Sequence, residues 1–73
     1  MTGVVRRIKD GGFFGFIESG ERDYFFHKED FEGSWGELRR IVITGRERVH
    51  VEFTPKDTPK GLRASEVKWI VGV

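Results

Sequence analysis

Phe14 and Phe16 stand two residues apart in the segment 14–18, which ends on Glu18. Side chains alternate between the two faces of a strand, so these three residues share one face and Ile17 points to the other. A strand of a small barrel has one solvent face, which suits a carboxylate, and one core face, which suits isoleucine. The spacing therefore predicts that both phenylalanines face solvent.

The segment 23–27 repeats this arrangement, with Phe25 on the same face as Asp23 and His27. If the two segments are adjacent strands, the phenylalanines and His27 form one exposed aromatic patch. Burying such a side chain would contribute about 1.5–3 kcal/mol, so a surface that forgoes this indicates a binding site. The reverse assignment remains open, but it would turn Glu18 and Asp23 inward, which is costly without partners.

Nucleobases are the ligands that such a patch suits, because every base has a π-face that can stack on an aromatic ring. Arginine and lysine side chains around the patch would contact phosphates or stack on bases. The candidate basic residues are Arg6, Arg7, Lys28, Lys60 and Arg63. Taken singly, each is better explained as a solvated surface charge. Together with the phenylalanines, they favour binding of single-stranded nucleic acid.

The composition describes one small domain, residues 1–73, with a nearly balanced charge. The 73 residues carry 13 Lys+Arg and 12 Asp+Glu, a formal net charge of +1. This is not the charge of a protein that coats a duplex by electrostatics alone. There is no cysteine, which excludes disulfides and thiolate metal sites.

Other chemistry finds little support in this sequence. His27 and His50 are the only histidines, so a zinc site would need carboxylate ligands. The Asp-Gly-Gly run at 10–12 is not followed by the Gly-Lys-Ser/Thr of a phosphate-binding loop. We therefore expect no enzyme, no metal and no cofactor. No apolar run approaches the roughly 20 residues of a membrane span, and we expect a cytoplasmic protein.

Short extended segments with frequent turn signals predict an all-β fold, a small closed barrel or sandwich. The expected strands are 3–9, 14–18, 23–27, 46–53 and 62–71. The phase of the last pattern changes between Ala64 and Val67, which predicts a β-bulge. No segment shows a sustained helical period.

The connecting segments are less regular. Turns are expected at 10–12 and 19–22, one helical turn at 28–31, and loops at 33–36 and 54–61. Pro55 and Pro59 favour the last of these loops. The stretch 40–44 is ambiguous between an early start of the fourth strand and part of a long loop.

Two motifs in this sequence resemble those of the cold-shock domain family. Residues 12–17 read Gly-Phe-Phe-Gly-Phe-Ile, similar to the family's Lys-Gly-Phe-Gly-Phe-Ile, and residues 24–27 read Tyr-Phe-Phe-His, similar to Val-Phe-Val-His. Residues 3–5 match the family's opening Gly-x-Val. Residues 59–67 look like its Pro-Lys-Gly-Pro-Gln-Ala-x-x-Val. The resemblance covers roughly residues 3–68.

The resemblance implies a five-stranded antiparallel Greek-key barrel of the oligonucleotide-binding (OB-fold) type. Family members bind single-stranded RNA and DNA with low sequence specificity, often as RNA chaperones or factors linked to transcription or translation. Carried over by position, the stacking residues would be Phe14, Phe16, Phe25 and His27. Trp35 would be the aromatic residue of a loop, and Lys60 a basic residue that contacts the strand.

Several positions depart from the family pattern. Arg7 stands where the family has tryptophan, Gly12 where it has a basic residue, Phe13 where it has glycine, and Lys28 where it commonly has an aromatic residue. The segment between Phe31 and Val49 is about four residues longer than usual. These departures indicate a divergent member with fewer stacking platforms.

The leading hypothesis is thus a monomeric binder of single-stranded nucleic acid. Its main rival is a protein-interaction module that docks a partner chain on the aromatic patch, which the near-neutral charge slightly favours. A third interpretation is an inert homologue that dimerises through the same patch.

Overall fold

The computed structural model describes residues 1–9, 13–45 and 47–70. The elements are β1 Thr2–Ile8, β2 Phe14–Ser19, β3 Arg22–His27, the 3-10 turn η1 Lys28–Asp30, β4 Phe31–Glu32, α1 Trp35–Thr44, β5 Val49–Thr58 and β6 Gly61–Trp69. The expected turn at 10–12, the expected strand start at Arg46 and the strand end at Val71 lie outside the described residues.

The strands form one sheet that closes on itself. Their order is β3–β2–β1–β5–β6–β4, and β3 also pairs with β6, which closes the barrel. The five longer strands form the wall of the barrel, and the two-residue strand β4 pairs with β6 beside it. Neighbours pair antiparallel except at β6, whose pairs with β3 and β4 are parallel. The expected all-β, five-stranded OB-type barrel is confirmed.

The core fills the barrel from the alternate residues of its strands. Val49, Val51 and Phe53 of β5 are buried, while His50 and Glu52 between them are exposed, as the alternation predicts. The buried residues are Val5, Ile8, Ile17, Tyr24, Phe26, Phe31, Leu38, Val49, Val51, Phe53, Ala64 and Val67. No polar side chain is buried in the part of the chain that the structure describes.

Strands β1 and β6 each carry one extra residue relative to a neighbouring strand. Between Glu52 and Thr54 of β5 the paired residue on β6 moves from Lys68 to Ser65, so β6 bulges where its pattern changes phase. Glu66, in this bulge, has a φ of 51°, a left-handed conformation that β-bulges use and glycine tolerates best. The predicted bulge between Ala64 and Val67 is confirmed.

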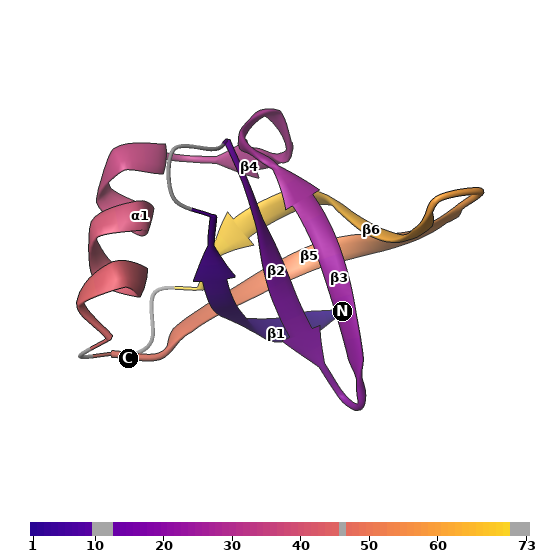
Figure 1. The fold of residues 1–73 in the computed structure, drawn as a ribbon, viewed down its shortest axis with the longest axis horizontal. Helices are drawn as coiled ribbons and strands as arrows, with labels where there is room; N and C mark the ends of the chain where they lie inside the picture. The colour runs from indigo at the N-terminus through magenta and orange to yellow at the C-terminus, as the bar shows by residue number, and fades with distance from the viewer. Residues whose placement is uncertain (10–12, 46, 71–73) are drawn as a thin grey trace.

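The expectation that the chain has no sustained helix is wrong. Residues 35–44 form α1, which packs beside the barrel (Figure 1). The side chain of Ser34 accepts a hydrogen bond from the backbone N–H of Glu37, and Gly45 ends the helix at a φ of 65°. These are ordinary helix caps. The stretch 40–44 is therefore neither strand nor loop. No helix among the described residues is long and apolar enough to cross a membrane.

The loop expected at 54–61 is also not found. β5 continues to Thr58, and its pairing with β6 runs from Thr54 opposite Ser65 to Thr58 opposite Gly61. This hairpin arm, residues 54–65, extends away from the barrel on the side opposite α1 (Figure 1). Pro55 is tolerated because it lies in the part of β5 that no longer pairs with β1. On that side of the strand there is no partner whose hydrogen bond the missing N–H of proline would remove.

Candidate nucleic-acid interface

Phe14, Phe16 and Phe25 form one cluster on the outer face of β2 and β3, which we call the aromatic face together with His27. Phe14 lies opposite His27 and Phe16 opposite Phe25 in the antiparallel ladder. The ring centroids are 5.4 Å apart for Phe14 and Phe25, 6.0 Å for Phe16 and Phe25, and 6.3 Å for Phe14 and Phe16. All four side chains are half-buried. The predicted solvent-facing orientation is confirmed.

The other face of these strands fixes their position. Ile17 and Phe26 are fully buried, and β1 approaches Gly15 so closely that a Cβ there would lie 2.7 Å from the carbonyl oxygen of Arg7. Such a distance leaves no room for any other residue. Gly15 thus lets β1 and β2 lie close together while Phe14 and Phe16 on either side of it point outward.

Two arginines lie over rings of the aromatic face. The guanidinium carbon of Arg7 is 5.4 Å from the centroid of Phe16, and that of Arg63 is 6.0 Å from the centroid of Phe25. Both distances fall within the usual cation–π range. The structure therefore brings Arg7 and Arg63 to the aromatic face, whereas Arg6 turns aside and pairs with Glu18 at 3.5 Å.

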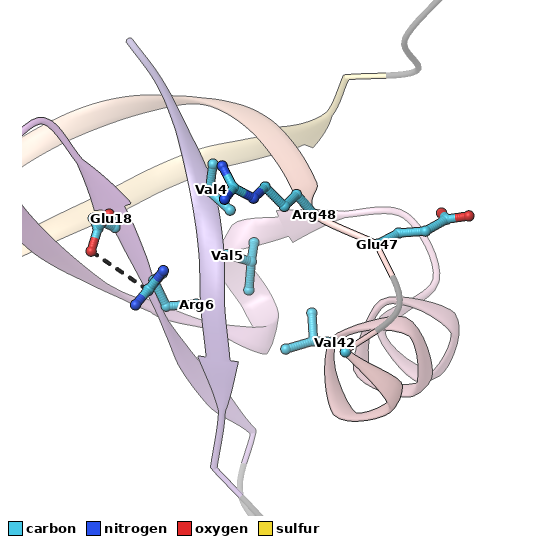
Figure 2. A pocket seen from close by; sticks show the side chains of 8 residues that line it. Val4, Val5, Arg6, Glu18, Val42, Glu47 and Arg48 are labelled. Atoms are coloured by element: carbon cyan, nitrogen blue, oxygen red, sulfur yellow. Dashed lines mark ion pairs between the residues drawn. The ribbon is translucent and has the colours of Figure 1, made fainter.

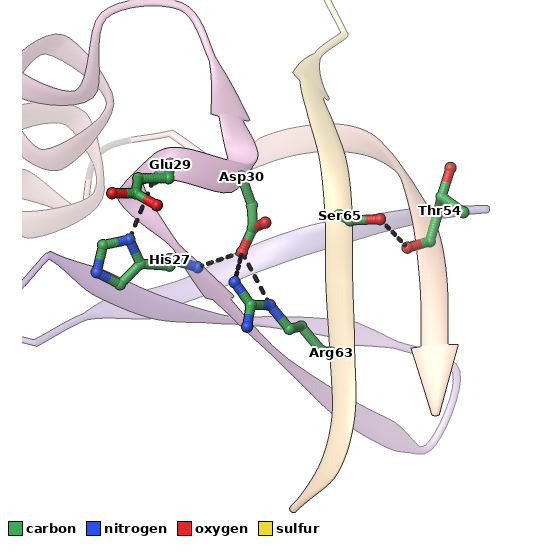
Figure 3. Close-up of polar contacts among 6 residues, drawn as sticks. All are labelled: His27, Glu29, Asp30, Thr54, Arg63 and Ser65. Atoms are coloured by element: carbon green, nitrogen blue, oxygen red, sulfur yellow. Dashed lines mark hydrogen bonds and ion pairs between the residues drawn. The ribbon is translucent and has the colours of Figure 1, made fainter. Parts of the chain in front are cut away.

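Asp30 organises the end of β3 (Figure 3). Its Oδ2 accepts hydrogen bonds from the backbone N–H of His27 at 2.9 Å and from Nε and Nη2 of Arg63 at 3.2 and 3.0 Å. The Nδ1 of His27 accepts from the backbone N–H of Glu29, so the ring carries its proton on Nε2 when neutral. His27 and Arg63 are thereby held beside Phe25.

Two hollows flank Phe16. One, of about 410 Å³, is lined by Phe16, Phe25 and residues of the hairpin arm, namely Thr58, Lys60, Gly61, Leu62 and Arg63. The other, of about 300 Å³, is lined by Phe16, Arg6, Arg7, Glu18 and Asp23. A solvent-facing row of aromatic rings with basic residues on both sides is a surface to which an extended strand of nucleotides can bind.

Trp35 does not lie in a loop. It is the first residue of α1, and its ring packs against Phe26 and Phe31 at centroid distances of 5.6 and 6.3 Å. Its indole Nε1 is buried with no hydrogen-bond partner among the described residues. The placement of Trp35 as a loop aromatic is therefore corrected, because the helix packs this partly buried ring against the core.

Phe13, which stands where the motif of the resembling family has glycine, is one of the most exposed apolar residues, at 56%. Lys28 lies beside it, with Nζ 5.2 Å from the Phe13 centroid. The signal that would have singled out Phe13 is the run of two phenylalanines before Gly15. In such a run one ring must leave the face of the other.

A separate hollow of about 250 Å³ lies between β1 and the end of α1 (Figure 2). Val5 and Val42 face each other across it, and Arg6 and Glu18 pair at its edge. Its lining mixes valines with charges of both signs and holds no aromatic ring. Among the described residues, no group of three or more His, Cys, Asp or Glu could hold a metal ion.

Comparison with known proteins agrees with this geometry at the level of structure. No protein-family model and no curated protein matches the sequence. Among solved structures, Drosophila Unr CSD456 is similar over 96% of this chain, with a TM-score of 0.64 and 25% sequence identity. This chain spans 26% of the length of that one. Barrel topology, motif positions and this structural neighbour together show that the chain has a cold-shock-like barrel of the OB type.

Proposed function

We propose that this protein binds single-stranded RNA or DNA with low sequence specificity, as a cytoplasmic RNA chaperone or a cold-shock-type factor linked to transcription or translation. A cold-shock fold with exposed aromatic rings indicates nucleic-acid binding in general. The preference for single strands follows from how those rings would be used.

The observation that carries this proposal is the cluster of Phe14, Phe16 and Phe25 on the solvent face, with guanidinium groups over two of the rings. Stacking of a base on such a ring contributes about 1–3 kcal/mol and requires no particular base. Bases in a duplex are already stacked and cannot reach the rings. The cluster therefore supports recognition of unpaired nucleotides.

The residues then divide into two roles. Phe14, Phe16, Phe25 and His27 stack bases, with His27 also offering its Nε2 to a base or phosphate. Arg7, Lys60 and Arg63 contact the backbone from the two sides of Phe16. Arg6 supports them from the far side of the second hollow, where Glu18 already holds it.

The test is a binding titration with a labelled seven-nucleotide oligothymidine and with a duplex of equal length, followed by anisotropy. We expect clear binding of the single strand and poor binding of the duplex. Phe16→Ala and Phe25→Ala should each weaken single-strand binding by about 1–3 kcal/mol. Ile43→Ala is a matched control, because Ile43 is exposed at 56% on α1 and lies outside the aromatic face.

Equal affinity for single strand and duplex would contradict the stacking mechanism. Absence of binding to either would leave the aromatic face to a protein partner, the interpretation that competes with nucleic acid.

A further inference from the structure

We infer that Phe13 and Lys28 form one more nucleotide subsite at the end of the aromatic face, Phe13 stacking a base and Lys28 contacting its phosphate. This inference rests on the proposed single-strand binding and extends it to Phe13, which lies outside the phenylalanine cluster, and to the pairing of its ring with Lys28.

The position of the pair is set by the end of the β2–β3 ladder. The last residues paired in this ladder are Phe14 and His27, and Phe13 and Lys28 are the next residue on each chain. Adjacent residues have Cα atoms about 3.8 Å apart. Because the ring of Phe13 leaves the face of Phe14, a base on Phe13 would lie beyond the end of the aromatic face, at a terminal position of the bound strand.

The backbone under this pair is held on both sides. The N–H of Lys28 donates to the carbonyl oxygen of Phe13, and the N–H of Lys9 donates to that of Phe14. Phe13 therefore projects from a fixed backbone although its ring is exposed. With the backbone fixed, only the side-chain torsions of Phe13 are restricted when a ligand stacks on its ring, which favours affinity.

Exposure and charge point to the same ligand. Phe13 is 56% exposed, so its ring forgoes the burial that an apolar side chain normally gains. The Lys28 ammonium lies over this ring at 5.2 Å, within cation–π range. A base can occupy the exposed part of the ring while the flexible lysine turns to the phosphate of the same nucleotide. A nucleotide suits both residues, because its flat base can stack on Phe13 and its phosphate can bind Lys28.

The experiment is an abasic scan. Oligothymidines of eight nucleotides, each with one abasic position, are titrated against the wild-type protein and Phe13→Ala, Phe13→Trp, Lys28→Gln and the control Ile43→Ala. In the wild type, loss of the base at one terminal stacked position should weaken binding at least about fivefold, the lower end of the stacking range. In Phe13→Ala, that position should show no further loss, and the intact strand should bind about fivefold more weakly.

In Phe13→Trp, removal of the base at the terminal position should still weaken binding as in the wild type. Lys28→Gln should flatten the log–log salt slope by about 0.7, the value for one phosphate on a single strand. An abasic profile in Phe13→Ala identical to that of the wild type would overturn the subsite while leaving single-strand binding in place. If the wild type binds no oligothymidine at all, the proposed function fails and the subsite with it. Thermal denaturation of each variant confirms that the fold is retained.

Discussion

Arg6 and Arg7 are consecutive in β1, yet both are exposed and they have different partners. The register between β1 and β2 shifts between Val5 and Arg7, so β1 holds one extra residue there and strict alternation is broken. Arg6 pairs with Glu18, while Arg7 reaches the ring of Phe16. In a regular strand one of the two arginines would point inward. The bulge thus allows both Arg6 and Arg7 to lie on the outer side of β1.

Arg7→Trp should tighten single-strand binding at high salt by about 1 kcal/mol. An indole stacks a base without depending on charge, whereas a guanidinium contact with phosphate is screened. The salt slope should become shallower by about 0.7, because one phosphate contact is lost. Titrations at several salt concentrations measure both. Weaker binding of the folded variant at every concentration would show that Arg7 makes a contact that an indole cannot replace.

Trp35→Phe should change the free energy of unfolding by less than about 1.5 kcal/mol, within the range of shape-related apolar substitutions. The loss of apolar contact with Phe26 and Phe31 is offset by removal of a buried N–H that has no partner among the described residues. Trp35→Ala should lose about 3–5 kcal/mol. Chemical denaturation followed by circular dichroism compares the two. Equal losses in both variants would mean that the indole N–H is satisfied in solution.

At the scale of elements, the bulge in β6 stores strain that a substitution can release. Glu66→Gly should raise the free energy of unfolding by about 0.5–1 kcal/mol, because a left-handed conformation costs a residue with a Cβ roughly 1–2 kcal/mol and the added flexibility of glycine offsets part of this gain. Glu52→Gly, in the partner strand β5, is the control. It should destabilise, since glycine weakens a regular strand. Destabilisation by both substitutions would argue against strain at Glu66.

The strands and their faces could be predicted from the sequence, but α1 could not. Alternation in β2, β3 and β5 is a local signal, and burial follows it residue by residue. In α1 the run from Ile41 to Thr44 is β-branched, which favours a strand locally. Tertiary packing of Trp35 and Leu38 on the barrel overrides that preference. The overlooked signals were the Ser34–Glu37 spacing and Gly45, which mark the two ends of a helix.

The candidate site shows the same division. The phenylalanines could be assigned because their polar neighbours in the strand give the direction of the face. The contacts of Asp30 with Arg63 join residues 33 positions apart, and no local pattern indicates them. The hairpin arm could not be predicted, because Pro55 and Pro59 locally favour a loop. Proline is nevertheless compatible with a strand that has a free edge.

At the scale of the whole molecule, closure of the barrel depends on a narrow contact. Within the described residues, the ladder between β3 and β6 has one residue pair, Phe25 with Arg63, and Asp30 binds Arg63 across the same junction at 3.0 Å. The Asp30 side chain is only 14% exposed, so this ion pair is better shielded than the open one between Lys68 and Glu32 at 3.8 Å.

Asp30→Asn should lower the free energy of unfolding by about 1–1.5 kcal/mol, because the amide oxygen still accepts these hydrogen bonds but without the charge that strengthens them. Binding should respond differently. Arg63, whose charge Asp30 compensates in the wild type, then meets phosphate with its full charge, so a wild-type slope of about −2 to −3 should steepen by up to about 0.7. Glu32→Gln, which removes the exposed pair with Lys68, should change stability by no more than about 1 kcal/mol. An unchanged slope in Asp30→Asn would place Arg63 outside the nucleic-acid contact.

The hairpin arm has a consequence for how copies of this protein behave at high concentration. Past Phe53, β5 pairs only with β6 among the described residues, so its outer side presents unpaired backbone groups. Such an edge is a template for strand addition by another molecule. Pro55 interrupts its row of donors, and Lys56 adds a charge that a neighbouring copy would repeat. Pro55, which favours a loop when the sequence is read alone, is thus a residue that disfavours strand addition at this exposed edge.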